Sequence, residues 1–232
     1  MLWGWFDPMY LLFLAPAMLL AAWAQFRVKS AFHEASQIPA GAGVTGARAA
    51  HEVLRSAGVD GVQIEPVEGF LSDHYDPRTK VLRLSPDVYA GRSLAALGIA
   101  AHEAGHALQD ADRYPLMVVR NAIVPIAGIG SNAAWVLMMV GFLLSSLALV
   151  TAGIVAFSLT VIFQLVNLPV EFDASRRARR VLLETGLVSA EESVEVKRVL
   201  DAAALTYVAA TLTAVLTLLY FLFRSGLLGD RR

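Results

Sequence analysis

Four long apolar stretches dominate this sequence and constrain its fold more than any other feature. They cover residues 8–26, 122–143, 147–168 and 202–223. A helix of roughly 20 apolar residues spans the hydrocarbon of a bilayer, and such helices are unusually long for the core of a soluble domain. The 232-residue chain is also 56% hydrophobic and 17% charged, whereas an average soluble domain is about 25% charged. We therefore predict a mainly α-helical integral membrane protein with four transmembrane helices.

The four stretches divide the chain into five parts. Residues 1–26 are expected to form the first transmembrane helix, and residues 27–121 a first extramembrane region. Residues 122–168 are expected to form a tight transmembrane hairpin. A second extramembrane region at 169–201 precedes the last transmembrane helix and C-terminal tail at 202–232. No basic segment precedes the first stretch, so we interpret it as a retained anchor rather than a signal peptide.

Basic residues near the membrane ends gather on one side of this topology. A transmembrane hairpin separates the regions 27–121 and 169–201, so both regions lie on the same side of the bilayer. Near the membrane that side carries Arg27, Lys29, Arg113, Arg120, Arg176, Arg177, Arg179, Arg180, Lys197 and Arg198, whereas the other side offers Arg224, Arg231 and Arg232. The positive-inside rule therefore predicts that both regions are cytoplasmic and that both termini are outside.

The first extramembrane region is predicted to be a small α+β unit. Capping residues, alternating apolar patterns and turn residues mark its elements. In chain order we expect a helix over 45–57, strands over 62–67 and 80–84 with a polar turn over 72–78 between them, a helix start at Ser85, and a longer helix from Ser93 to about Asp110. A unit this small buries little core alone, so we expect it to lean on the membrane helices.

An HExxH motif, His102-Glu103-Ala104-Gly105-His106, lies on the longer helix. Histidines four residues apart share one helix face, so both imidazoles can reach one metal ion. Glu103 sits about 100° round the helix, close enough to a metal-bound water to take its proton. Zinc lowers the pKa of such a water toward about 7 and polarises the scissile carbonyl. The motif therefore predicts a hydrolytic Zn²⁺ site with Glu103 as its general base.

Composition narrows the remaining ligand chemistry. The chain has no cysteine, which excludes disulfides, thiolate metal sites and cysteine nucleophiles, so any metal must be held by His, Asp or Glu. The net charge is −1, without the basic surplus typical of a nucleic-acid-binding protein.

A catalytic zinc usually takes three protein ligands, so a third must come from elsewhere. After the predicted hairpin the chain returns to the same side, where the first acids are Glu171 and Asp173. On a helical wheel for residues 171–184, Glu171 lies within the stripe of small and apolar residues, whereas Asp173 falls among charged residues. We predict that Glu171 is the third ligand and that Asp173 is a solvated acid at a helix N-terminus.

Several sequence segments resemble the YugP-type neutral zinc metallopeptidases of bacterial membranes. The matching segments are residues 23–30, 73–77, 81–85, 102–109, 168–175 and 203–210, which extend over nearly the whole chain. The layout is also similar to that of other membrane gluzincins. The ligand Glu of those proteins opens a helix after a membrane hairpin, and an Asp four residues later orients a His ligand. That fifth position is Ser175 here, so we expect another group to orient the histidine.

The resemblance implies a peptidase but no particular substrate. With the HExxH motif and the four apolar stretches, it leads us to expect a membrane-embedded zinc endopeptidase of the bacterial inner membrane with a zincin-like catalytic unit. Its expected partners are the lipid bilayer and a membrane-protein or peptide substrate. Two alternatives stay open. The first is an intramembrane protease of the site-2 type, because residues 94–108 are apolar enough to lie in lipid. The second is a non-catalytic membrane scaffold that holds a structural zinc.

Three further residues are candidates for contacts with substrate or transition state. His74 and Tyr75 lie in the turn before the strand 80–84, and a strand in this position can pair with an extended substrate. A nearby His, Tyr or Arg can stabilise the oxyanion. Arg176 is the third candidate for that role.

Overall fold

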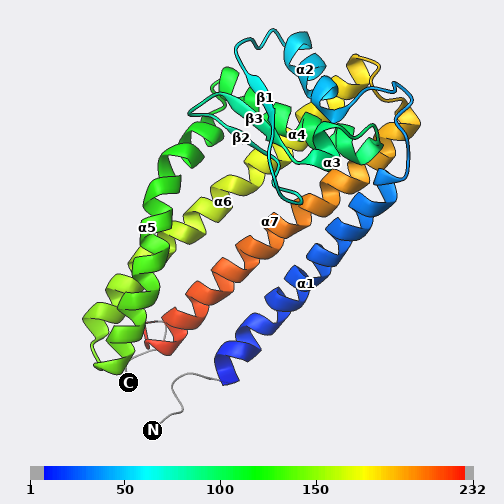
Figure 1. The fold of residues 1–232 in the computed structure, drawn as a ribbon. Helices are drawn as coiled ribbons and strands as arrows, with labels where there is room; N and C mark the ends of the chain where they lie inside the picture. Colours follow the sequence, from blue (N-terminus) through cyan, green and yellow to red (C-terminus); the bar gives the residue numbers. More distant parts are fainter. Residues whose placement is uncertain (1–7, 228–232) are drawn as a thin grey trace. The chain divides into compact units, whose positions relative to one another are not determined.

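The computed structural model describes residues 8–227, so Arg231 and Arg232 and the outer ends of the first and last predicted segments lie outside the described residues. The described part is mainly helical with one small sheet (Figure 1). Its elements are α1 (Pro8–Ser36), α2 (Gly46–Ser56), β1 (Gln63–Pro66), β2 (His74–Asp76), β3 (Val81–Leu84), α3 (Pro86–Tyr89), α4 (Leu94–Ala111), α5 (Pro115–Leu143), α6 (Leu147–Glu184) and α7 (Ala190–Arg224).

The chain forms two compact units. The helical unit comprises the described residues within Met1–Trp23, Val118–Leu168 and Thr206–Arg232, and the mixed unit comprises Ala24–Met117 and Pro169–Leu205. Four helices, α1, α5, α6 and α7, are long and apolar enough to cross a membrane. Each of them also continues beyond the apolar stretch predicted from the sequence, and α6 does so through Pro169.

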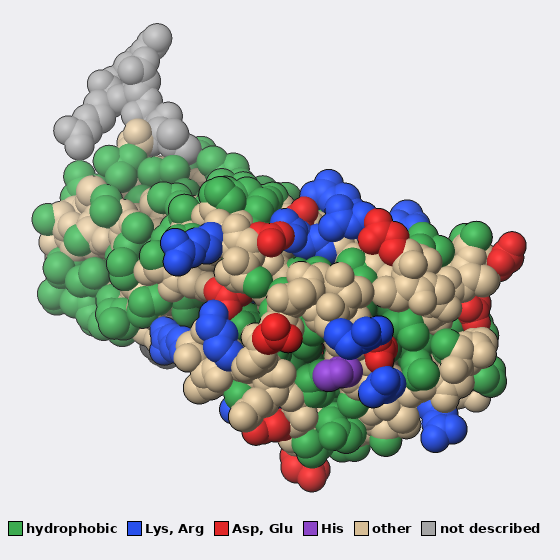
Figure 2. Space-filling model, turned by 90° about the horizontal axis from the view of Figure 1, so that it is seen from above, with side chains coloured by type: hydrophobic (Ala, Val, Ile, Leu, Met, Phe, Trp, Pro, Cys, Tyr) green, Lys and Arg blue, Asp and Glu red, His purple; other side chains and the backbone are tan. Residues whose placement is uncertain are grey.

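The surface of the helical unit is apolar. Exposed residues such as Leu19, Ile129 and Leu143 have between 72% and 82% of their surface free. Hydrophobic side chains cover this unit in Figure 2, whereas Lys, Arg, Asp and Glu side chains gather over the mixed unit. An apolar surface of this kind is unfavourable in water and favourable in lipid.

The mixed unit contains a three-stranded sheet in the order β1-β3-β2. β1 pairs with β3 in parallel, and β2 pairs with β3 antiparallel. The strands predicted at 62–67 and 80–84 are confirmed, but the expected polar turn at 72–78 contains the edge strand β2. Three residues are too few to reveal an alternating pattern. The carboxylate of Asp73 anchors the start of β2 by accepting hydrogen bonds from the backbone N–H and hydroxyl of Ser85, at 2.8 and 3.0 Å.

Helix α4 lies in the core of the mixed unit. Ser93 caps its N-terminus by accepting a hydrogen bond from the backbone N–H of Ala96. Small side chains along the helix allow close packing, and α4 contacts α2, α3, β2 and β3. Its apolar residues, Leu97 and Ala101 among them, are buried in the core cluster of this unit. The apolar character of α4 therefore reflects burial in protein.

Candidate metal centre

His102 and His106 lie one turn apart on α4, as the HExxH spacing predicts. Their ring centroids are 4.8 Å apart and the rings are nearly perpendicular, at 82°. His106 is buried and His102 is half-buried. Both Nε2 atoms are directed toward the same carboxylate oxygen, on the neighbouring helix α6.

Glu171 of α6 provides that oxygen. Its Oε2 atom lies 3.3 Å from Nε2 of His102 and 3.4 Å from Nε2 of His106, and its side chain is 3% exposed. The three ligand atoms lie within 4.8 Å of one another. Ligand bonds of about 2.1 Å in a tetrahedral zinc site would separate ligand atoms by about 3.4 Å. Two imidazole nitrogens and a carboxylate oxygen at this spacing fit a divalent zinc ion.

The two helices that carry these residues touch beside the site. Gly105 of α4 faces the backbone of Ala174 in α6, and a Cβ atom at Gly105 would lie 2.6 Å from the Ala174 carbonyl oxygen. Only glycine permits this approach. The helix pair can therefore bring Glu171 to the histidines.

The hydroxyl of Ser175 lies 3.1 Å from Nδ1 of His102. We expected a different group to orient this histidine because Ser stands where the similar proteins have Asp. That expectation is wrong, since the serine itself reaches the ring. The Ser175 side chain is shorter than that of Asp, but α4 and α6 pack so closely that its hydroxyl still reaches the ring.

His106 has a separate partner on its own helix. Its Nδ1 lies 3.0 Å from Oε1 of Gln109, three residues later. The Gln109 amide donates in turn to the carbonyl oxygen of Val170 at 2.8 Å and to Oδ2 of Asp173 at 3.0 Å. Gln109 is completely buried. We did not predict a role for Gln109 from the sequence. A single polar residue on the buried face of an apolar helix could have indicated that its side chain has a polar partner.

The interpretation of Asp173 as a solvated acid at a helix N-terminus is wrong. Helix α6 runs unbroken through Pro169, so Asp173 lies inside it. Asp173 is 8% exposed and accepts hydrogen bonds from the guanidinium groups of Arg176 and Arg177, at 2.7 and 2.6 Å. The helical wheel placed Asp173 beside charged residues correctly, but could not show that α4 covers that face.

Burial raises the pKa of Glu103 to about 7. The charge of His102 opposes this rise, whereas the charges of Glu171 and Asp73 add to it. Burial also raises the pKa of Glu171, but hydrogen bonds with His102 and His106 outweigh it and lower the pKa well below its usual range. Glu171 is therefore an ionised carboxylate, as a metal ligand must be, while Glu103 can gain and lose a proton near neutral pH.

The remaining candidates differ in their exposure and in their partners. His74 on β2 is exposed, and its charge lowers the pKa of Glu103. Tyr75 is 9% exposed and donates its hydroxyl to Oδ2 of Asp110 at 2.7 Å. The Arg176 side chain is 73% exposed and forms its ion pair with Asp173. The strand suggested for substrate pairing, β3, lies between two others, so among the described strands only β1 and β2 have an open edge.

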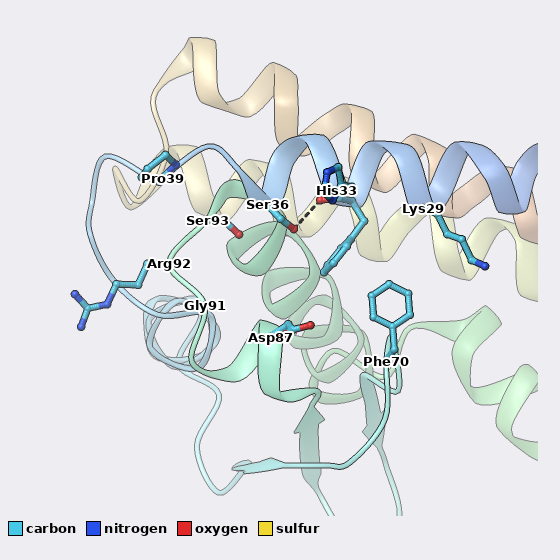
Figure 3. A pocket seen from close by; sticks show the side chains of 10 residues that line it. Lys29, His33, Ser36, Pro39, Phe70, Asp87, Gly91, Arg92 and Ser93 are labelled. Carbon is cyan, nitrogen blue, oxygen red and sulfur yellow. Dashed lines mark hydrogen bonds between the residues drawn. The ribbon is translucent and has the colours of Figure 1, made fainter.

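A separate groove of about 870 Å³ lies in the mixed unit between the end of α1 and the segment before α4 (Figure 3). Phe32 and Phe70 meet edge to face along it, with ring centroids 5.4 Å apart. Lys29, His33, Asp87 and Arg92 are the ionisable side chains that line it. None of the residues that line the groove belongs to the metal centre.

Four apolar helices long enough to cross a membrane and a buried cluster of two histidines and a glutamate define a helical membrane protein with a candidate zinc centre. The chain belongs to the family described as "Putative neutral zinc metallopeptidase", whose sequence profile matches residues 10–226. It is 47% identical to the "Putative membrane protease YugP" of Bacillus subtilis (strain 168) over 214 residues, which cover 92% of this chain and 95% of that protein. No solved structure matches the chain.

Proposed function

We propose that this protein is a membrane-embedded, zinc-dependent endopeptidase that cleaves membrane proteins near the cytoplasmic surface. The observation that carries the proposal is the convergence of His102, His106 and Glu171 on one point, with Glu103 beside them. Membership of a zinc metallopeptidase family supports the reaction class. The relative's name, a membrane protease, supports the setting.

In this proposal His102, His106 and Glu171 hold Zn²⁺. The ion supplies a Lewis acid for the scissile carbonyl and makes water a stronger acid. Two neutral imidazoles and one carboxylate leave a net positive charge at the centre, which attracts the carbonyl oxygen of a peptide. Three protein ligands also leave one coordination position open, as a catalytic site requires.

Glu103 acts as the general base and then as the general acid. Its carboxylate oxygen accepts a proton from the attacking water and later delivers it to the leaving amine. A pKa near 7 suits both steps, because the group must hold the proton and release it within one cycle. His74 on β2 is our candidate for the group that stabilises the oxyanion.

The catalytic unit consists of residues 27–121 and 169–201, which we propose to be zincin-like and cytoplasmic. Support for their grouping is the compact mixed unit of Ala24–Met117 and Pro169–Leu205. Support for the orientation is the excess of Lys and Arg in these segments. A topology reporter fused after Arg232 should be active outside the cytoplasm. A cytoplasmic reporter signal there would overturn the orientation.

The structure favours a cleft outside the hydrocarbon over a site-2 type of intramembrane protease. Helix α4, which carries HExxH, is absent from the four described helices that qualify as spans. It packs against α2, α3, β2 and β3 of the mixed unit. A site among these elements would receive segments that emerge from the membrane.

The decisive experiment compares the purified zinc-loaded wild type with Glu103→Gln on a membrane-protein substrate. The substitution keeps the shape of the side chain but removes its ability to accept a proton. We expect the wild type to cleave and the variant to lose about 10²–10⁴-fold in rate while it keeps its zinc. Equal cleavage by both would exclude Glu103 as the base. No zinc-dependent cleavage by the wild type would favour the scaffold alternative.

A further inference from the structure

We propose that Gln109 and Asp173 act as a positioning pair that sets the tautomer of His106 and thereby tunes the affinity of the site for zinc. The inference rests on the proposed zinc site. It adds a role for two residues that contact neither substrate nor metal. The pair joins α4, which carries the histidines, to α6, which carries Glu171.

The hydrogen bonds of Gln109 leave one orientation for its amide group. Val170 presents a carbonyl oxygen and Asp173 presents a carboxylate oxygen, and both groups accept hydrogen bonds. The NH₂ group of Gln109 must therefore face these two oxygens. In a completely buried side chain the reverse orientation would put oxygen against oxygen and leave the amide hydrogens unsatisfied.

That orientation directs the amide oxygen of Gln109 at Nδ1 of His106, 3.0 Å away. An amide oxygen accepts and cannot donate, so Nδ1 must carry the proton. A neutral imidazole protonated at Nδ1 has its lone pair on Nε2. The Nε2 atom is the one that faces Glu171 at 3.4 Å. By holding the proton on Nδ1, Gln109 thus makes Nε2 of His106 the nitrogen that a metal would bind.

Asp173 holds Gln109 in place through a network that reaches the protein surface. Arg177 bonds to Asp173 and also to Asp112, which follows the last residue of α4. Arg176 bonds to the other carboxylate oxygen of Asp173. Because these groups come from both helices, the same network fixes the ring of His106 and the position of α6 beside it.

His102 lacks this constraint. Its Nδ1 partner is the hydroxyl of Ser175, which can donate as well as accept and so permits either tautomer. We therefore expect the zinc affinity to depend more strongly on the contact between Gln109 and His106 than on the contact between Ser175 and His102. Ser175→Ala should weaken zinc binding less than removal of the Gln109 amide does.

The test measures the zinc dissociation constant of the purified full-length protein by competition with a chelator, together with the visible spectrum of the Co²⁺-loaded protein. Gln109→Leu should weaken zinc binding by about 10–100-fold and alter the cobalt spectrum. Asp173→Asn retains an oxygen that accepts from Gln109 and should stay within about threefold of the wild type. Asp173→Leu removes this acceptor and should resemble Gln109→Leu.

Ser85→Ala is the matched control, because it removes a buried hydrogen bond in the mixed unit that involves no candidate ligand. Its zinc affinity and cobalt spectrum should equal those of the wild type. A folded Gln109→Leu protein that binds zinc as tightly as this control would overturn the inference. If the wild type and Glu171→Gln bind zinc equally poorly, the proposed zinc site itself fails instead.

A second measurement does not depend on the folding of any Gln109 variant. In metal-free wild-type protein labelled with ¹⁵N-histidine at pH 8, His106 should carry a proton on Nδ1, the nitrogen that faces Oε1 of Gln109. Assignment comes from the signal that disappears in His106→Ala. An unprotonated Nδ1 of His106 would exclude the proposed role of Gln109.

Discussion

Gly105 of α4 lies directly against the carbonyl of Ala174 in α6, so closely that a Cβ atom at Gly105 would be 2.6 Å from that oxygen. At this contact the helix that carries the histidines packs against the helix that carries Glu171. The missing side chain at one glycine therefore determines whether the three candidate ligands can meet.

Gly105→Ala should force α4 and α6 apart and separate Glu171 from the histidine pair. We expect zinc affinity to fall at least tenfold and stability to fall by about 1–3 kcal/mol, as for an overpacked core. Chelator competition and thermal unfolding measure the two effects. Gly128→Ala is the matched control, because a Cβ there meets no atom within 4 Å. Undiminished zinc binding in Gly105→Ala would contradict the close-contact argument.

Glu171→Gln should lose most of the zinc while the fold persists. The amide has the size of the carboxylate but lacks the charge that offsets a divalent ion, so we expect metal affinity to fall by more than tenfold. Metal content after dialysis measures the change. The control is Glu184→Gln on the same helix, whose side chain is 64% exposed and which should keep full zinc content. Full zinc content in Glu171→Gln would remove it from the ligand set.

The rate of cleavage should fall as the pH decreases through the pKa of Glu103. Burial raises the pKa of Glu103 to about 7, and only the ionised carboxylate can accept a proton from water. A bound cation would favour the ionised form and shift the acid limb downward. Below the apparent pKa the rate should drop about tenfold per pH unit. A profile of rate against pH measures this, and a profile without an acid limb would argue against Glu103 as the base.

Tyr75→Phe should affect stability more than catalysis. The Tyr75 hydroxyl donates to Asp110, and Lys80 pairs with the same carboxylate. Loss of this bond should lower the free energy of unfolding by about 1 kcal/mol, while kcat stays within about threefold because the hydroxyl is already engaged. Denaturant unfolding and steady-state kinetics measure the two quantities. A large fall in kcat with unchanged stability would assign Tyr75 to the transition state.

Local sequence patterns were sufficient for much of the fold. Apolar runs predicted four helices able to span a membrane, and the caps at Thr45 and Ser93 begin α2 and α4 as expected. Such features depend on neighbouring residues in one element, so the sequence carries them directly. The edge strand β2 escaped prediction because its place depends on pairing with β3 and on the Asp73–Ser85 contact.

The same division applies to the candidate metal centre. Helical periodicity alone put His102 and His106 on one face of α4, and the pattern of small residues around Glu171 singled out that acid as their partner. The hydrogen bonds of Ser175, Gln109 and Asp173 are visible only in the tertiary structure. Spacing within a helix is a local property, whereas the partner of a buried polar group depends on which helices meet and how closely. Here that approach is set by a glycine whose effect appears only when α6 packs against it.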